Sequence, residues 1–147
     1  MELSLRAATM EDAMDIMRWR NDEQSRANSF SKNIIRIPEH LEWYKKKMAD
    51  ENCHLFILTA GSEKAGYIRI DVTGDFGEIS YIIAPEKRGQ GLGKEILALL
   101  EKSLPDGVNA LIGFTLPQNE GSGKCFEYNG YSKFVAGDIF CFVKRIR

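Results

Sequence analysis

A glycine-rich segment between a strand and a helix constrains this chain more than any other feature. Residues 88–94 read Arg-Gly-Gln-Gly-Leu-Gly-Lys. A β-branched run, 78–83, precedes this segment, and apolar residues at helical spacing, 96–100, follow it. Three glycines allow a tight turn and let the backbone approach a ligand without an intervening Cβ. We refer to residues 88–94 as the glycine loop.

The place of this loop at the start of a helix favours phosphate as its ligand. The first turn of a helix offers unpaired N–H groups and the positive end of the helix dipole. Basic side chains stand at both ends of the loop. The sequence therefore predicts a pyrophosphate site formed by Arg88, Gly89, Gln90, Gly91, Leu92, Gly93 and Lys94.

Three known phosphate-binding patterns can be compared with the loop. A P-loop fails because Arg88 replaces its first glycine and Glu95 its serine or threonine. The dinucleotide pattern Gly-x-Gly-x-x-Gly fails from both possible starting glycines, because Lys94 or Ile96 occupies the third position. The pattern Arg-x-x-Gly-x-Gly fits from Arg88. On this motif alone, a glycine turn that binds nothing remains an alternative.

A second motif follows one strand later. Asn119 and Ser122 have the spacing Asn-x-x-Ser, Phe126 follows, and Gly130-Tyr131 ends the segment. Together with the glycine loop, this order resembles the GNAT superfamily of N-acetyltransferases over residues 3–144. The front half, with Trp-Arg-Asn-Asp at 19–22, resembles the branch that contains ribosomal-protein N-terminal acetylases and nucleotide-linked amino-sugar acetyltransferases of pseudaminic-acid pathways.

This resemblance implies an α/β fold, the GNAT fold. It has a single mixed, mostly antiparallel sheet of about seven strands, flanked by helices, with a V-shaped splay between the fourth and fifth strands. Periodicity predicts strands at 3–6, 54–60, 65–72, 76–83, 110–116, 132–136 and 139–144. It predicts helices at 9–21, from 38 onward, at 92–104 and at 119–129. In the helix that begins at 38, Leu41, Tyr44 and Met48 are expected to face the core. Residues 25–37 are expected to be a loop.

Size and charge limit the classes of protein. A chain of 147 residues predicts one domain, 1–147. A net charge of −1 argues against nucleic acid as a partner held by bulk charge. No apolar run reaches the roughly 20 residues of a membrane helix, and the first residues lack the features of a signal peptide. We expect a cytoplasmic protein with no membrane partner, either a monomer or a homodimer.

Cysteine and histidine usage favours neither disulfides nor a metal site. The three cysteines are an odd number and form no Cys-x-x-Cys pair. The two histidines, His40 and His54, lack a metal-ligand spacing. We expect no metal.

The resemblance implies acetyl-coenzyme A as the acetyl donor. Its pantetheine arm is expected to pair with the backbone at Ile82 and Ile83. Asn119, Ser122 and Phe126 are expected to contact coenzyme A, while backbone N–H groups at the splay stabilise the tetrahedral oxyanion. Asn119 also fits the role of a helix N-cap.

Two catalytic roles have candidates. Glu78, at the start of the strand before the glycine loop, resembles the glutamate base of some family members, and a solvent-facing strand residue is the alternative. Many members use a tyrosine as general acid where this chain has Phe126. Tyr131, with Tyr81 as an alternative, is the candidate for that role, and protonation by water is also open.

The acceptor is the least constrained element. We expect a primary amine, with a nucleotide-linked amino sugar favoured, and assign Arg20, Asn21, Phe30 and Tyr81 to its site. A protein N-terminus or another small amine is an alternative. An acyl-coenzyme A-binding module without turnover is the alternative from another functional class.

Overall fold

The computed structural model describes residues 2–146. Its strands are β1 (Leu3–Ala7), β2 (Cys53–Ala60), β3 (Glu63–Thr73), β4 (Phe76–Ile83), β5 (Ala110–Thr115), β6 (Ser132–Ala136) and β7 (Ile139–Arg145). Its α-helices are α1 (Ala13–Asn21), α2 (Glu23–Ala27), α3 (Ile37–Ala49), α4 (Leu92–Glu101) and α5 (Glu120–Tyr128). Short 3₁₀ turns lie at Met10–Asp12 and Pro85–Lys87.

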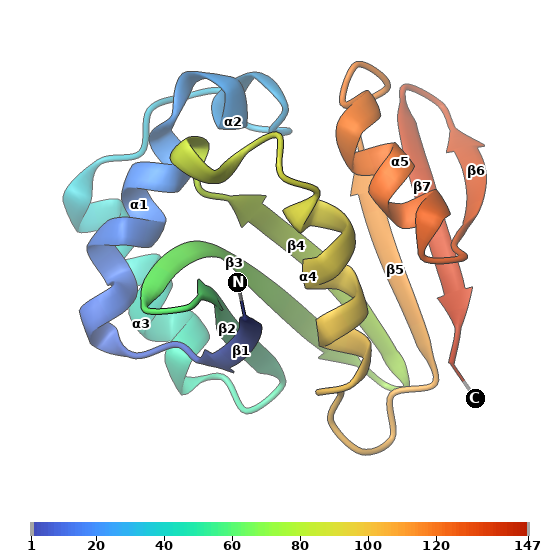
Figure 1. Ribbon diagram of the computed structural model, residues 1–147, viewed down its shortest axis with the longest axis horizontal. Helices are drawn as coiled ribbons and strands as arrows, with labels where there is room; N and C mark the ends of the chain where they lie inside the picture. Colours follow the sequence, from blue (N-terminus) through green and yellow to red (C-terminus); the bar gives the residue numbers. More distant parts are fainter. Residues whose placement is uncertain (1, 147) are drawn as a thin grey trace.

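The strands form one sheet in the order β1-β2-β3-β4-β5-β7-β6 (Figure 1). β2, β3 and β4 make an antiparallel meander joined by short turns such as Gly61-Ser62, and β1 pairs antiparallel with β2 at the edge after a connection that contains α1, α2 and α3. The β4–β5 pair is parallel, and α4 provides the crossover that a parallel pair requires. The expected α/β architecture with a mixed, mostly antiparallel seven-stranded sheet is confirmed.

The splay between the fourth and fifth strands is also present. β4 and β5 pair only from Phe76↔Ala110 to Ile79↔Gly113. Beyond this point β4 continues to Ile83, still paired with β3 on its other side. Figure 1 shows β4 and β5 diverging toward the glycine loop. The β4 edge after Ile79 therefore faces an opening rather than another strand.

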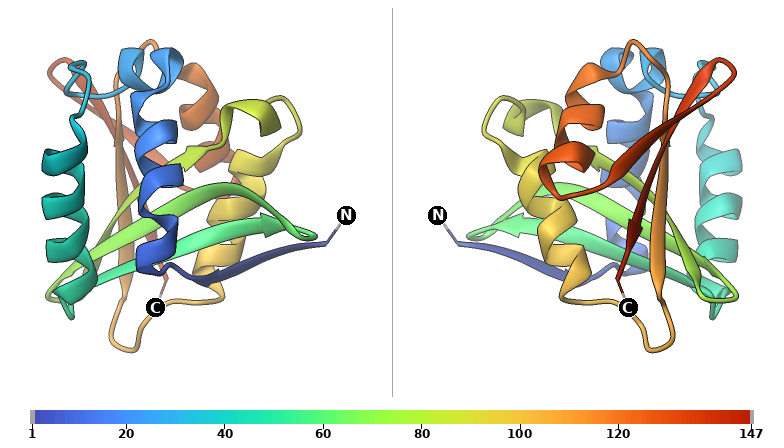
Figure 2. Two further views of the ribbon diagram at one scale, coloured as in Figure 1. Left: turned by 90° about the vertical axis from the view of Figure 1, so that its left-hand side faces the viewer. Right: turned by 90° about the vertical axis from the view of Figure 1, so that its right-hand side faces the viewer.

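Helices cover both faces of the sheet (Figure 2). On one face, α4 packs its stripe Leu92, Ile96, Leu97 and Leu100 against the sheet, and Phe126 of α5 joins the same core. On the other face, Trp19 of α1 and Tyr44 of α3 are almost completely buried. Burying side chains of this size contributes roughly 1.5–3 kcal/mol each.

The structure corrects two details of the sequence analysis. Part of the segment expected as a loop is helical, since Asp22 accepts a hydrogen bond from the Ser25 N–H at 3.2 Å and so caps α2. In α3, Met48 is 38% exposed, whereas His40 is fully buried. The polar His40 belongs inside because its Nε2 lies 2.6 Å from the Ala13 carbonyl oxygen.

Helix ends also differ slightly from expectation: α4 ends at Glu101 rather than near residue 104. No helix within residues 2–146 combines the length and apolar character needed to cross a bilayer.

Candidate active site

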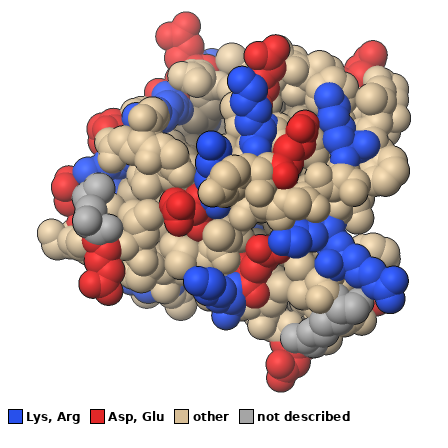
Figure 3. Space-filling view, turned by 45° about the vertical axis from the view of Figure 1, so that its right-hand side comes forward, with Lys and Arg blue, Asp and Glu red and all other residues tan. Residues whose placement is uncertain are grey.

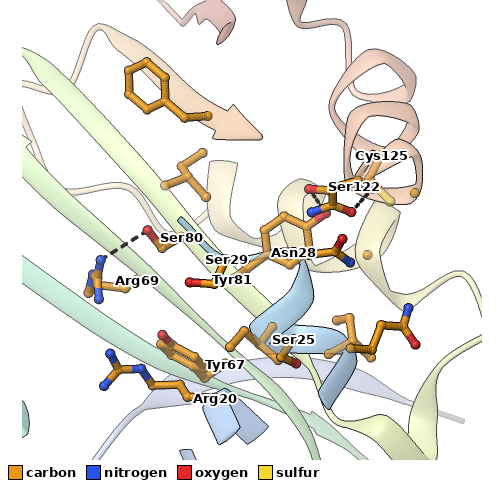
Figure 4. A pocket seen from close by; sticks show the side chains of 18 of the residues that line it. Arg20, Ser25, Asn28, Ser29, Tyr67, Arg69, Ser80, Tyr81, Ser122 and Cys125 are labelled. Carbon is orange, nitrogen blue, oxygen red and sulfur yellow. Dashed lines mark hydrogen bonds between the residues drawn. The ribbon is translucent and has the colours of Figure 1, made fainter. Parts of the chain in front are cut away.

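A cavity of about 880 Å³ lies at the splay. Its walls come from α2 and the segment after it, from β3 and β4, from the glycine loop, and from β5 and α5. In Figure 4, Arg20, Tyr67 and Arg69 lie toward one end, and Ser122 and Cys125 lie at the other. We call these the acceptor end and the donor end. On the face drawn in Figure 3, acidic and basic side chains are interspersed, with no broad region of one sign.

The glycine loop borders the donor end. Gly89 and Gly91 have φ values of +79° and +75°, a left-handed conformation that side chains rarely adopt. Gly91 is the N-cap of α4, so the first N–H groups of that helix lie at the cavity wall. Gly93 is required for a different reason: a Cβ there would lie 2.7 Å from Cys125 Sγ.

The basic residues of the loop have separate roles. Arg88 lines the cavity and donates to Asp22 Oδ2 at 2.6 Å and to Ser25 Oγ at 3.1 Å, which ties the loop to α2. Burial would raise the pKa of Asp22, but the Arg88 and Ser25 hydrogen bonds outweigh it and lower that pKa. Gln90 and Lys94 do not line the cavity, and Lys94 Nζ lies 4.7 Å from the Tyr128 ring centroid.

Helix α5 begins at the donor end. Asn119 caps it by accepting the Ser122 N–H at 3.4 Å. The Ser122 hydroxyl is hydrogen-bonded to Tyr81 Oη of β4 at 2.9 Å, and both residues line the cavity (Figure 4). Burial raises the pKa of Tyr81, so its phenol stays protonated.

Phe126 points its ring into β5. A Cβ on Gly113 would lie 2.3 Å from Phe126 Cζ, so the tip of the ring faces the strand backbone. The ring also stacks on Phe142 with centroids 5.1 Å apart. Tyr131 packs edge-on against Phe126, is only 5% exposed, and does not line the cavity. Tyr81 is therefore the tyrosine at the donor end.

The acceptor end is built by alternation along two strands. Tyr67 and Arg69 of β3 and Glu78 and Ser80 of β4 share the face that α1 and α3 cover, and all four line the cavity. Arg69 donates to Asp71 Oδ2 at 2.8 Å and to Ser80 Oγ at 3.2 Å. Glu78 is exposed and sits where the paired part of β4 gives way to the splay.

The segment after α2 forms the outer wall of the acceptor end. Asn21 holds it in place, donating to the Ile35 carbonyl at 2.9 Å and accepting the Ile35 N–H at 2.7 Å. Asn21 itself does not line the cavity, whereas Phe30 does and is 59% exposed.

Most of the residues expected at the site therefore share one cavity. It brings together Arg20, Phe30, Glu78, Tyr81, Ile82, Ile83, Arg88, Gly89, Gly91, Leu92, Gly93, Asn119, Ser122 and Phe126, and it leaves out Asn21, Gln90, Lys94 and Tyr131. Tyr67, Arg69, Ser80 and Cys125 also line the cavity, although the sequence alone assigns them no role in the site. The alternation of Tyr67, Arg69 and Asp71 in β3 is the signal that would have identified the first two. Within residues 2–146, no three His, Cys, Asp or Glu side chains group as metal ligands would.

Comparison with known families identifies the chain. Residues 2–132 match the family model described as an acetyltransferase (GNAT) domain. The chain belongs to the GNAT acetyltransferase family. The expected acyl-coenzyme A-dependent N-acetyltransferase is thereby confirmed at the level of the family. No curated protein sequence shows a significant match to this GNAT chain.

Solved structures share the fold at low sequence identity. Spermidine N-acetyltransferase from Vibrio cholerae, in complex with coenzyme A and spermine, has a TM-score of 0.85 at 18% identity, over 98% of this chain and 95% of that one. A domain from Methanocaldococcus jannaschii has a TM-score of 0.85 at 23% identity, over 98% of both chains. Aminoglycoside acetyltransferase AAC(6')-Ib, in complex with coenzyme A, has a TM-score of 0.82 at 19% identity, over 98% and 95%.

Proposed function

We propose that this GNAT protein transfers an acetyl group from acetyl-coenzyme A to the primary amine of a nucleotide-linked amino sugar. One observation carries the transfer: a single cavity connects the glycine loop, the unpaired β4 edge and Glu78. A donor held by the loop and an amine next to Glu78 would meet at the splay.

Donor binding would use main-chain groups. The pyrophosphate binds the N–H groups at the start of α4, where the dipole and the absence of side chains at Gly89 and Gly91 favour it. The pantetheine arm pairs with the β4 edge beyond Ile79, as an added strand would. Two solved relatives, the spermidine and aminoglycoside acetyltransferases, contain coenzyme A, which supports this choice of donor.

Glu78 is the proposed base. The amine nitrogen attacks the thioester carbonyl, and the oxygen takes the negative charge of the tetrahedral intermediate. Glu78 removes a proton from the nitrogen, directly or through water. The C–S bond then breaks, its electron pair stays on sulfur, and the thiolate takes up one proton. The products are the amide and free coenzyme A.

Tyr81 is the proposed hydrogen-bond donor to the departing thiolate. The location of Tyr131 in the core gives it no access to the cavity. Tyr81 lines the cavity, and its hydroxyl contacts both Ser122 and Cys125. When Ser122 donates to Tyr81, the phenol proton can turn from Cys125 to the sulfur of the leaving group. A donor aimed at a developing charge stabilises the transition state without ionising.

The acceptor is chosen on three grounds. Segments 66–71 and 77–81 resemble the sugar-nucleotide members of the branch more than the ribosomal-protein acetylases. The cavity is large, and polar side chains line its acceptor end, including Asn28, Ser29, Ser31 and Asn33. A peptide N-terminus would use the same chemistry in a narrower, acidic groove. The acceptor end contains Arg20 and Arg69 with a single acid, Glu78, which disfavours a polycationic amine.

Thiol release tests the proposal. Wild-type protein with acetyl-coenzyme A is assayed with a uridine-diphosphate amino sugar, a peptide with a free N-terminus, and spermidine. We expect release that depends on the amine and is fastest with the sugar nucleotide. Binding of acetyl-coenzyme A without release for any amine would favour a non-catalytic module, and absence of binding would reject the proposal altogether.

A further inference from the structure

Arg20 is a half-buried cation without a counterion. Its guanidinium carbon lies 4.0 Å from the centroid of the Trp43 ring, and Nη1 lies 3.1 Å from His40 Nδ1. Burial lowers the pKa of Arg20, because the low-dielectric surroundings disfavour its charge. Among residues 2–146, no carboxylate lies within ion-pair distance of it.

Its hydrogen-bond partner does not neutralise it. His40 Nε2 lies 2.6 Å from the Ala13 carbonyl oxygen, so Nε2 carries the proton and Nδ1 accepts from Arg20. Burial, with a smaller contribution from the charge of Arg20, lowers the pKa of His40, which keeps the ring neutral. A guanidinium has five N–H groups, and this arrangement occupies one.

The other basic residues at the cavity are paired. Arg69 contacts Asp71 at 2.8 Å, Lys87 contacts Glu63 at 3.1 Å, and Arg88 contacts Asp22 at 2.6 Å. Arg20 is the exception within the described part of the chain.

A second polar group at the same place also lacks a partner. Tyr67 is only 3% exposed, lines the cavity next to Arg20, and its hydroxyl makes no hydrogen bond to another residue in the range 2–146 (Figure 4). Tyr67 Oη is not one of the fully enclosed unpaired side-chain atoms of the described residues, so this hydroxyl opens to the cavity with its proton available to a ligand. A ligand that accepts hydrogen bonds from both Arg20 and Tyr67 would satisfy the two groups together.

We propose that Arg20 and Tyr67 form an oxyanion subsite at the acceptor end, which binds a phosphate or carboxylate group of the amine substrate. This inference rests on the proposed acetyl transfer and specifies the acceptor class: an amine that carries an oxyanion at some distance from its nitrogen. The subsite and Glu78 line the same cavity, so one end of the substrate is anchored while the amine reaches the splay. Polyamines are poor acceptors because their only charges are positive.

Anion binding tests the subsite directly. Inorganic phosphate and acetate are titrated separately into protein saturated with coenzyme A, so that the glycine loop is occupied. Tryptophan fluorescence reports binding, because Trp43 lies under Arg20 while the other tryptophan, Trp19, is buried in the core. We expect saturable binding of at least one anion. The tighter anion identifies the substrate group as phosphate or carboxylate.

Variants assign the binding to this subsite. Arg20→Gln is expected to raise the anion Kd about 10- to 100-fold, as for loss of a charged hydrogen bond, and Tyr67→Phe to raise it about 3- to 10-fold. The matched control is Arg18→Gln on the same helix, because Arg18 is exposed and contacts Glu86 outside the cavity. The Kd for coenzyme A should not change in any of the three.

The outcomes separate the two proposals. Absence of saturable anion binding, or equal binding by wild type and both subsite variants, overturns the subsite. Tyr67→Phe keeps its ring in the core, so it tests the subsite even if Arg20→Gln does not fold. If coenzyme A does not bind, the proposed function is rejected instead. The subsite is then tested by titrating the anions into wild type and variants without coenzyme A.

Discussion

Tyr81 Oη and Ser122 Oγ lie 2.9 Å apart and join strand β4 to the first turn of helix α5. This hydrogen bond bridges the two elements that border the donor end of the cavity. The phenol ring also meets Phe126 edge-on, with centroids 6.0 Å apart, so packing fixes its position. The pair thus holds a protonated hydroxyl at the cavity wall.

Removing that hydroxyl should slow the chemical step. Tyr81→Phe keeps the ring and deletes the donor, and we expect kcat to fall about 100-fold with little change in the KM for acetyl-coenzyme A. The control is Tyr131→Phe, whose hydroxyl has no partner in the core and should be dispensable. Steady-state kinetics checks both. Wild-type kcat in Tyr81→Phe would show that the thiolate needs no help from this residue.

Glu78→Gln should remove the base. We expect kcat/KM at neutral pH to fall about 10²- to 10⁴-fold, since glutamine cannot accept the proton of the amine. Glu95→Gln, on an exposed position of α4 outside the cavity, is the matched control. Wild-type kcat/KM in Glu78→Gln would assign the base to another group.

Gly93 and Cys125 should be energetically coupled. Gly93→Ala places a Cβ 2.7 Å from Cys125 Sγ, and we expect a loss of stability of about 1–2 kcal/mol from overpacking. In the background of Cys125→Ala the sulfur is gone, so the same change should be neutral or stabilising. Urea unfolding of the four proteins measures the coupling. Additive effects would contradict the close approach of α4 to α5.

His40 should make the protein less stable in mild acid. Because burial lowers its pKa below the ordinary value of 6.5, the unfolded chain binds this proton more readily than the folded one. Its stabilising contribution is therefore complete above pH 6.5 and is lost as pH falls through the folded pKa, at up to about 1.4 kcal/mol per pH unit. Urea unfolding between roughly pH 5 and 7 measures this slope. His40→Gln should reduce the pH dependence of the unfolding free energy. An unchanged slope in this variant would assign the pH dependence to other groups.

The fold could be predicted from the sequence because its signals are local. The alternation in residues 76–83 and the helical spacing after the glycine loop fixed β4 and α4 to within a few residues. The loop itself restricts its own backbone, since Gly89 and Gly91 adopt positive φ.

The acceptor end could not be predicted in the same way. Arg20, Tyr67 and Trp43 come from three separate elements, and only the packing of α1 and α3 on the sheet brings them together. The same limit applies to the two tyrosines. Tyr131 is kept from the cavity by packing in the core around Phe126, whose ring meets Gly113 of β5. This contact joins residues from neighbouring elements, so no short sequence motif predicts it.

The central claim is that the glycine loop holds the pyrophosphate and delivers the thioester to the splay beside Glu78. A crystal structure with acetyl-coenzyme A bound tests it most directly. The account predicts the pyrophosphate on the N–H groups of residues 89–93 and the thioester between β4 and β5, with sulfur within hydrogen-bond reach of Tyr81 Oη. A vacant loop, with the donor bound elsewhere or not at all, would contradict it.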